Sequence, residues 1–479
     1  MSINTTIKSI QDIMRKDVGV DGDAQRISQL VWMMFLKIYD DLEVQREMME
    51  DNYKSVIPKK YRWSQWAGNE EGITGDELMN FVNNELFPTL KELPLSTKNP
   101  RTRVLRSVFE DAYNYMKSGT LMRQVINKIN AIDFNRKDDR HLFGDIYEKI
   151  LKDLQSAGNA GEYYTPRAVT QFMTEMVDPQ LGEKVLDPAC GTGGFLASII
   201  DHVESNYVKT TKDRTKLQSM ITGYDKKPLP HMLCITNMIL HGIEVPTNVL
   251  RDNALARPLR DYKPSDRVDV VLTNPPFGGV EEDGIENNFP APVRTRETAD
   301  LFLVLITHIL KEGGRGAVVL PDGTLFGEGV KTKIKQEFLE GCNLHTIVRL
   351  PKSVFAPYTS IKTNLLFFTK GEPTKEIWYY EHPYPEGMKA YSKTKPMSIK
   401  EFDAEKAWWN KRKESERTWK VSIKEIQEAN YNLDFKNPNT VEEDLGDPEE
   451  LLNKYQALMK EVSQSRDELK AELVSALER

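Results

Sequence analysis

Residues 274–277 combine an amide, two prolines and an aromatic ring, as Asn274, Pro275, Pro276 and Phe277. They follow the apolar run VDVVLT, which predicts a buried strand that ends at Asn274. Because proline fixes its φ angle and has no N–H, the turn after this strand accepts hydrogen bonds and donates few. The side-chain oxygen of Asn274 and the main-chain oxygen of Pro275 are therefore suited to hold both hydrogens of a planar –NH2 group.

The chemistry that fits such a site is transfer of a group to the held nitrogen. Phe277 offers a flat face on which a nucleobase can stack, worth about 1–3 kcal/mol, although a base in a duplex must first be flipped out. An in-line displacement relies on positioning and electrostatics, and needs no strong base, because the amine loses its proton after gaining positive charge. For Asn-Pro alone, a turn that only ends a strand is the alternative interpretation.

A glycine-rich segment, DPACGTGGFL, begins at Asp187 and is typical of a loop between a strand and a helix. Glycines at such a loop let a ligand approach the backbone closely. The chain has neither the GxGxxG spacing of dinucleotide-binding loops here nor a GxxxxGK[ST] phosphate loop anywhere. The candidate binding residues are Asp187, Gly191, Thr192, Gly193 and Gly194.

Carboxylates end the next two predicted strands. Asp225 is placed to accept hydrogen bonds from both ribose hydroxyls of an adenosine, and Asp252, followed by Asn253, to accept from an adenine amino group. Acids around the loop favour a positively charged ligand with ribose and adenine but no phosphates, and S-adenosylmethionine is such a ligand. Either aspartate alone is also explained by helix capping or by surface charge.

Just upstream, the segment EYYTPR contains a helix start, in which Thr165 caps and Pro166 begins the helix. The segment either does only this or also covers the methionine part of the cofactor. Its candidate cofactor contacts are Glu162, Tyr163, Tyr164, Thr165, Pro166 and Arg167.

Short apolar runs that alternate with amphipathic stretches must position these motifs. They predict an α/β fold, a Rossmann-like doubly wound parallel sheet of seven strands with helices on both faces. The predicted strands are residues 184–187, 220–225, 248–251, 268–273, 316–320, 346–350 and 364–369. In such sheets ligands bind beyond the carboxyl ends of the strands, which is where the glycine loop, Asp225, Asp252 and Asn274 fall.

Three regions are expected along the chain. Apolar residues at helical spacing predict an all-helical N-terminal domain over residues 1–155, followed by the sheet domain over residues 156–395. Residues 396–479 are interpreted as a helical C-terminal tail. Its last helix is expected to start at Asp447 and Pro448, with apolar residues three, four or seven apart that pack on the same chain or on a partner.

The composition of the chain further restricts the class of protein. With 39% hydrophobic and 29% charged residues, the chain is an ordinary globular protein, and its net charge of −7 argues against coating nucleic acid without help. The apolar run LVWMMFL is too short to cross a membrane and no secretion signal is recognisable, so a cytoplasmic protein is expected. Cys190, Cys234 and Cys342 are widely spaced and predict neither disulfides nor a metal site.

Together the motifs resemble those of amino-group DNA methyltransferases, with the cofactor motif before the catalytic motif as in the adenine-N6 group. More closely, the chain resembles the modification subunit of type I restriction-modification systems, through EYYTPR, DPACGTGGFL, GYDKKP, RDNAL, VVLTNPPFGG and TNLLFF. The resemblance implies that the first two motifs and Asp225 bind S-adenosylmethionine and that residues 274–277 are catalytic. Many relatives have Tyr where this chain has Phe277, so stacking is kept and a hydroxyl is lost.

The same resemblance implies partners. A separate specificity subunit reads the DNA sequence, usually one for two modification subunits, and a restriction subunit joins in some complexes. The chain itself shows no translocase or nuclease motif and no evident target-recognition domain. Two alternatives stay open from the residues alone: methylation of another planar nitrogen, such as a protein glutamine amide or guanine N2 in RNA, and an inactive scaffold that binds the cofactor.

Overall fold

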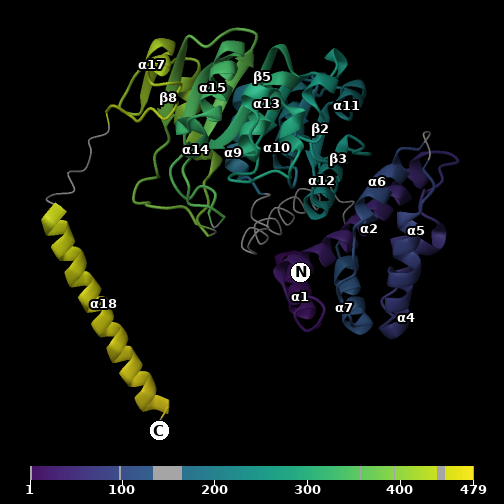
Figure 1. Cartoon of the computed structure of the whole chain (residues 1–479). Helices are drawn as coiled ribbons and strands as arrows, with labels where there is room; N and C mark the ends of the chain where they lie inside the picture. Colours follow the sequence, from purple (N-terminus) through teal and green to yellow (C-terminus); the bar gives the residue numbers. More distant parts are fainter. Residues whose placement is uncertain are drawn as a thin grey trace. The chain divides into compact units, whose positions relative to one another are not determined.

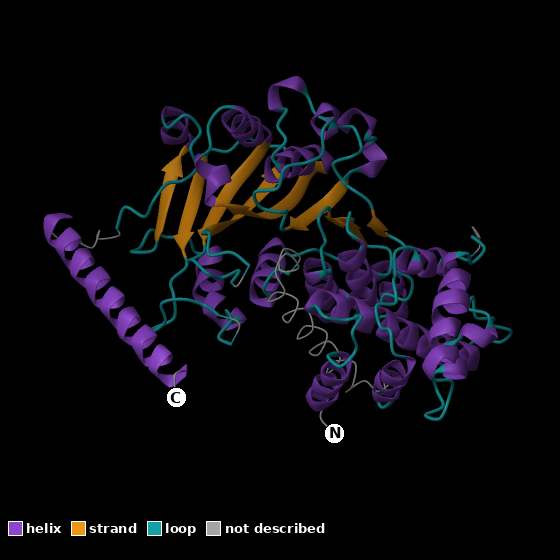
Figure 2. Ribbon diagram, turned by 60° about the horizontal axis from the view of Figure 1, so that its bottom comes forward, coloured by secondary structure: helices purple, strands orange, loops and turns teal. Residues whose placement is uncertain are grey.

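The computed structural model describes residues 3–95, 99–132, 164–356, 358–392, 394–439 and 448–477. The chain divides into two compact units, Met1–Lys436 and Asn437–Arg479. The first unit holds a sheet covered by helices on both faces, and a group of N-terminal helices (Figure 1; Figure 2). Among the described residues, no helix combines the length and the apolar character needed to span a membrane.

The sheet has nine strands in the order β3-β2-β1-β4-β5-β7-β6-β8-β9. Their bounds are β1 Val185–Asp187, β2 Ile221–Asp225, β3 Val249–Arg251, β4 Val268–Thr273, β5 Leu310–Pro321, β6 Cys342–Arg349, β7 Thr363–Lys370, β8 Glu376–Glu381 and β9 Thr418–Ser422. The seven predicted strands are confirmed as β1 to β7. Strands β1 to β5 pair in parallel, so their carboxyl ends meet at one edge.

Two parts of the sheet differ from the prediction. Strand β7 lies between β5 and β6 and runs antiparallel to both, so the sheet is mixed and not parallel throughout. Strands β8 and β9 extend it past β6, and β9 falls in the tail that was expected to be helical. These short segments gain their backbone hydrogen bonds from a sheet edge formed by distant residues, which local spacing does not reveal.

Alternating side chains of the strands are buried on opposite faces. In β4, Val270 and Leu272 belong to one core cluster and Val271 to the other. Strands buried on both faces read as continuous apolar runs, as VDVVLT does. Helices α9 (Arg167–Val177), α10 (Gly194–Tyr207) and α12 (Pro228–Leu240) contribute to the first core, and α13 (Thr298–Ile309) and α15 (Val330–Gly341) to the second. The shorter helices are α11 Thr211–Leu217, α14 Asp322–Phe326, α16 Asp403–Trp409 and α17 Ile423–Glu428.

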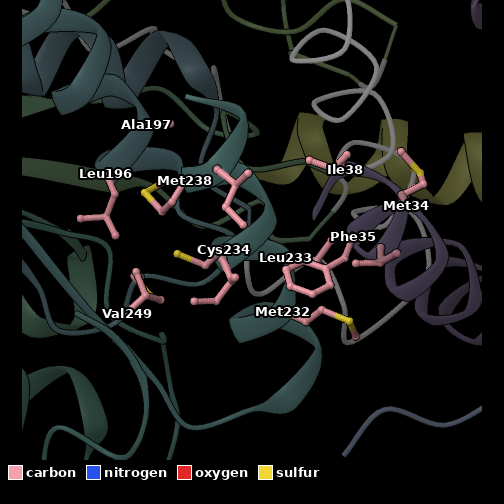
Figure 3. Close-up of a cluster of buried hydrophobic side chains, with 14 of the residues drawn as sticks. Met34, Phe35, Ile38, Leu196, Ala197, Met232, Leu233, Cys234, Met238 and Val249 are labelled. Atoms are coloured by element: carbon pink, nitrogen blue, oxygen red, sulfur yellow. The ribbon is translucent and has the colours of Figure 1, made fainter. Parts of the chain in front are cut away.

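The regular elements of the described N-terminal residues are helices, as predicted. The helices are α1 Ile3–Met14, α2 Asp23–Met49, α3 Trp63–Trp66, α4 Gly75–Asn80, α5 Phe87–Lys91, α6 Arg101–Phe109 and α7 Gly119–Asn130. Phe35 and Ile38 of α2 pack beside Met232 and Leu233 of α12, so these helices share the first core with the sheet (Figure 3). The predicted domain boundary at residue 155 lies outside the described residues, and the one at residue 395 stays a prediction.

The second unit contains helix α18, Pro448–Leu477. Proline stands at its first position, where the missing N–H has no intrahelical acceptor to lose. The predicted cap, Asp447, lies outside the described residues. Exposed apolar side chains follow one another at intervals of three, four or seven residues: Leu452, Tyr455, Met459, Val462 and Leu469. This spacing is typical of a helix that pairs with another helix.

Candidate active site

A cavity of about 220 Å³ lies where the carboxyl ends of β1, β2 and β4 meet. The glycine loop, the end of β2 and the turn after β4 all contribute to its wall. The predicted residues that the fold brings together there are Thr165, Asp187, Gly191, Gly194, Asp225, Asn274 and Pro276. Segments more than one hundred residues apart in the chain, such as Thr165 and Asn274, thus form one site.

The amide of Asn274 is oriented by one hydrogen bond. Its Nδ2 donates to the Oγ1 of Thr165 over 3.0 Å. Its Oδ1 is buried and has no hydrogen-bond partner among the described residues. A buried acceptor without a donor costs about 1–3 kcal/mol. A ligand that donates an N–H or O–H to this oxygen would remove that cost.

Asp187 joins the glycine loop to strand β4. Its Oδ1 accepts hydrogen bonds from the Oγ1 of Thr273 at 2.7 Å and from the N–H of Ala189 at 3.1 Å. Complete burial raises the pKa of Asp187 to about 7. Because Thr273 directly precedes Asn274, this pair sets the position of the turn after β4 against the glycine loop.

Asp225 ends β2 and faces the same cavity. Its carboxylate accepts hydrogen bonds from the N–H groups of Gly191 at 3.2 Å and Lys227 at 2.8 Å. Burial raises the pKa of Asp225 to about 6, although these hydrogen bonds favour the charged form. The carboxylate is thus fixed by backbone donors on both sides and lies at the cavity wall, as ribose recognition requires.

The glycine loop depends on glycine at Gly193. Its φ of +82° is a left-handed conformation, and a Cβ there would lie 2.8 Å from the Sγ of Cys234 in α12. The carbonyl of Thr192 accepts a hydrogen bond from the Nδ2 of Asn237 over 3.0 Å. Thr192 and Gly193 therefore shape the loop against α12, and Gly191 and Gly194 face the cavity.

Other predicted cofactor residues lie beside the cavity and not in its wall. Tyr164 and Pro166 line a separate cavity of about 70 Å³. Arg167 donates to the carbonyl of Gly194 at 3.1 Å and pairs with Asp201, which joins α9 to α10. Glu162 and Tyr163 lie outside the described residues. The two predicted residues after β3 have different surroundings. Asp252 is exposed, and the Nδ2 of Asn253 donates to the carboxylate of Glu281 over 3.1 Å.

The remaining catalytic candidates flank Asn274. Pro275 is buried, Pro276 is exposed at the cavity, and Phe277 is half-buried. The ring of Phe277 lies edge-on to that of Phe355, with centroids 6.0 Å apart and planes at 74°. Phe277 lies three residues after Asn274 in the chain but is not among the residues that line the cavity.

Sequence reasoning missed Glu281. This carboxylate is 3% exposed and lines the cavity together with Lys226 and Thr298. It accepts hydrogen bonds from the Nζ of Lys226 at 3.2 Å and the Oγ1 of Thr298 at 3.1 Å. Its one signal in the sequence is an acid shortly after Phe277, in GGVEED, and that does not distinguish a buried carboxylate from a solvated loop.

Acidic residues outnumber basic residues in the wall of the cavity. Three of its carboxylates, Asp187, Asp225 and Glu281, face two lysines, Lys226 and Lys227. Within the part of the chain that the structure describes, no group of three or more His, Cys, Asp or Glu residues could hold a metal ion. The carboxylates of the cavity wall and the unpartnered Oδ1 of Asn274 are acceptors that can hold an organic ligand and a planar amine. A mixed α/β sheet with this glycine loop, an acid after β2 and Asn-Pro-Pro-Phe after β4 defines a Rossmann-like amino-group methyltransferase.

Comparisons with known proteins agree with this class. Residues 138–446 match the model of the N-6 DNA Methylase family, and residues 3–129 match that of the HsdM N-terminal domain. The chain is 62% identical to the EcoEI methylase subunit, a type I restriction enzyme subunit of Escherichia coli, over 100% of this chain and 99% of that protein. It belongs to the N-6 DNA methylase family, as a methylase subunit of the type I restriction enzymes.

Two solved structures are similar over nearly the whole chain. A modification subunit of a type I restriction enzyme described from Vibrio vulnificus YJ016 is 47% identical, with a TM-score of 0.83, covering 92% of this chain and 97% of that one. A chain from a structure of type I R-M system assembly is 37% identical, with a TM-score of 0.82, covering 98% and 97%. The predicted fold class, family and enzyme class, an adenine-N6 DNA methyltransferase, are thus confirmed.

Proposed function

We propose that this chain transfers a methyl group from S-adenosylmethionine to adenine N6 in double-stranded DNA, at sequences chosen by a separate specificity subunit. The observation that carries this proposal is the buried, unpartnered Oδ1 of Asn274 beside an acid-lined cavity. Adenine N6 brings the two N–H donors that this oxygen and the neighbouring Pro275 carbonyl are suited to accept. The cytoplasmic location predicted from the sequence belongs to the same proposal.

The residues present fit S-adenosylmethionine. The carboxylate of Asp225 would accept from both ribose hydroxyls, and Gly191 and Gly194 leave room for close approach to the backbone. Glu281, Asp187 and Asp225 give the cavity a negative field that suits a positively charged sulfonium. When bound, the cofactor supplies an electrophilic methyl group.

The chain's own residues would prepare the amine. The Oδ1 of Asn274 and the carbonyl of Pro275 accept the two N6 hydrogens, which localises the nitrogen lone pair out of the purine ring. The hydrogen bond from Asn274 to Thr165 fixes which way the amide faces. Phe277, supported edge-on by Phe355, offers the face on which the flipped base stacks. After transfer the amine releases its proton to solvent.

The proposal is tested by labelled methyl transfer into defined DNA. The chain is assayed with and without its specificity subunit, and the modified base is mapped. We expect label on adenine N6, at one sequence, only with the complete complex. Label in RNA or in a protein glutamine amide and none in DNA would replace the proposal with the alternatives above, and cofactor binding without any transfer would indicate a scaffold.

We further propose that α18 contacts the specificity subunit, with two modification subunits for each specificity subunit. Support comes from the exposed stripe of Leu452, Tyr455, Met459, Val462 and Leu469, whose spacing suits packing against another helix. The relationship to methylase subunits of multi-subunit enzymes supports the same partner. We also propose that a restriction subunit can join this complex.

A chain shortened to residues 1–436 is expected to fold and to bind the cofactor, because those residues form a compact unit, but to lose assembly with the specificity subunit. Size-exclusion chromatography with light scattering measures assembly. In the full chain, Tyr455→Ser with Val462→Ser should weaken assembly at least 10-fold. The matched change Gln456→Ser with Lys460→Ser, off the stripe, should not. Normal assembly of the shortened chain would contradict the proposed contact.

A further inference from the structure

A second cavity, of about 450 Å³, lies apart from the cofactor site and is strongly basic. Its charged lining residues are Arg349, Lys352, Lys362, Lys389 and Arg417, against one carboxylate, Glu381. In a chain of net charge −7, this is a local reversal of sign. Such a concave basic surface attracts anions, and phosphates above all.

The cations of this cavity fall into two groups. Arg349 is largely buried and is occupied by the carboxylate of Asp434 and the carbonyl of Phe435, so it stabilises the fold. The other four, Lys352, Lys362, Lys389 and Arg417, are exposed. Their side chains form no ion pair or hydrogen bond with the described residues, so they are available to a ligand.

The four available cations stand at the same edge of the sheet as the catalytic turn. Lys362 immediately precedes β7, whose first residue pairs with the last residue of β5. Strand β5 pairs in parallel with β4, which leads into Asn274. Lys352 follows β6, Lys389 follows β8 and Arg417 precedes β9. Because β6 and β8 run antiparallel to β7 and β9, all these positions meet at one edge.

One loop connects the basic cavity to the catalytic turn. Residues 350–356 follow β6; Lys352 lines the cavity, and Phe355 lies edge-on to Phe277. The loop is held in place, since Tyr384 donates its hydroxyl to the carbonyl of Lys352 over 2.8 Å. The loop that holds Phe355 against Phe277 therefore also carries one of the free cations, Lys352.

We infer that the cavity formed by Lys352, Lys362, Lys389 and Arg417 binds a backbone phosphate of the DNA strand that carries the target base. This inference rests on the proposed function. A base turned onto Phe277 brings its flanking phosphates to the same edge, and a strand must be held there while the base is out of the stack. Phosphate contacts carry no sequence information, so the choice of sequence stays with the specificity subunit.

The test uses the full chain with its specificity subunit and a duplex that contains the recognition sequence. In the variant Lys352→Ala with Lys362→Ala, the KM for DNA should rise about 10-fold. The slope of the logarithm of the DNA association constant against the logarithm of salt concentration should become shallower by about 1, since one phosphate contact contributes about 0.9. Cofactor affinity should stay unchanged.

The matched control is Lys209→Ala with Lys212→Ala. Both lysines are exposed, and they lie in or just before α11, which precedes β2 and so stands at the opposite edge. This variant changes the net charge equally but should leave the KM for DNA and the salt slope unchanged. A second pair, Lys389→Ala with Arg417→Ala, repeats the test on other strand ends if the loop after β6 is disturbed.

Unchanged KM and salt slope in both cavity pairs would overturn the inference. The cavity variants could also lose binding of inorganic phosphate while their KM for DNA and salt slope stay unchanged. That result would assign the cavity to a small anion and would likewise overturn the inference. These failures differ from failure of the proposed function. If the variants methylate adenine N6 with normal DNA affinity, only the phosphate contact is wrong; if the unchanged complex methylates no DNA, the proposed function is wrong.

Discussion

Replacing Asn274 by alanine is expected to lower the rate of methyl transfer to DNA by roughly 10²-fold or more, with cofactor affinity retained. The reason is that the variant loses a buried acceptor in the cavity, the Oδ1 of Asn274, that has no hydrogen-bond partner among the residues that the structure describes. The carbonyl of Pro275 does not replace this acceptor, because in the proposed mechanism it already accepts the other N6 hydrogen. Single-turnover methylation at saturating cofactor, together with calorimetric titration of S-adenosylmethionine, measures the two quantities separately.

Two further variants sharpen this test. Thr165→Val removes the hydroxyl that accepts from the Nδ2 of Asn274 and keeps the side-chain volume. It should lower the transfer rate less than Asn274→Ala, because the amide stays but is no longer held in one orientation. Val280→Ala, at an exposed residue of the same cavity wall, is the control and should be close to neutral. Methylation by Asn274→Ala at the unchanged rate would rule out the mechanism.

Asp225→Asn should weaken binding of S-adenosylmethionine by about 10- to 100-fold, since a hydrogen bond to a charged group contributes about 1.5–3 kcal/mol. In the unchanged chain, burial raises the pKa of Asp225 to about 6. Ribose hydroxyls donate to the charged form, so binding requires loss of this proton. Cofactor affinity is therefore expected to rise about tenfold per pH unit up to about pH 6 and to level off above it.

The same titration of Asp225 affects the stability of the ligand-free fold in the opposite direction. A higher pH strengthens cofactor binding but lowers the free energy of unfolding. Because the folded-state pKa of Asp225 lies above its unfolded value of about 3.9, its contribution to stability is full below about pH 4. That contribution is lost as the pH rises through about 6. Thermal unfolding of the ligand-free chain and of Asp225→Asn across this pH range measures how much of the loss of stability is due to Asp225. With the cofactor bound, stability should instead rise with pH.

Asp252→Asn is the matched control for Asp225→Asn. Both are aspartates that follow consecutive strands, but Asp252 is exposed and outside the cavity wall. Its substitution should leave the pH dependence intact and change affinity only a little. If Asp252→Asn instead abolished the pH dependence and Asp225→Asn did not, ribose recognition would have to be moved to the end of β3.

The sequence alone determined the parts of the site that consecutive residues encode. An apolar run followed by Asn-Pro-Pro-Phe, a glycine loop after a strand and an acid after the next strand each form within one short segment. Their spacing fixes where a strand stops and which backbone groups lack donors. Parallel strands place their carboxyl ends at the same edge of a sheet. These local patterns were therefore enough to predict that Asp187, Asp225 and Asn274 lie at one edge, as they do.

Only the tertiary structure decided what surrounds those residues. Thr165 orients Asn274 from 109 positions away, and Glu281 becomes a buried member of the cavity through Lys226 and Thr298. The antiparallel insertion of β7 and the addition of β8 and β9 likewise bring the free cations together at the sheet edge that also holds the turn after β4. Such contacts depend on strand order and register between distant segments, and the side-chain spacing within a single segment carries no record of them.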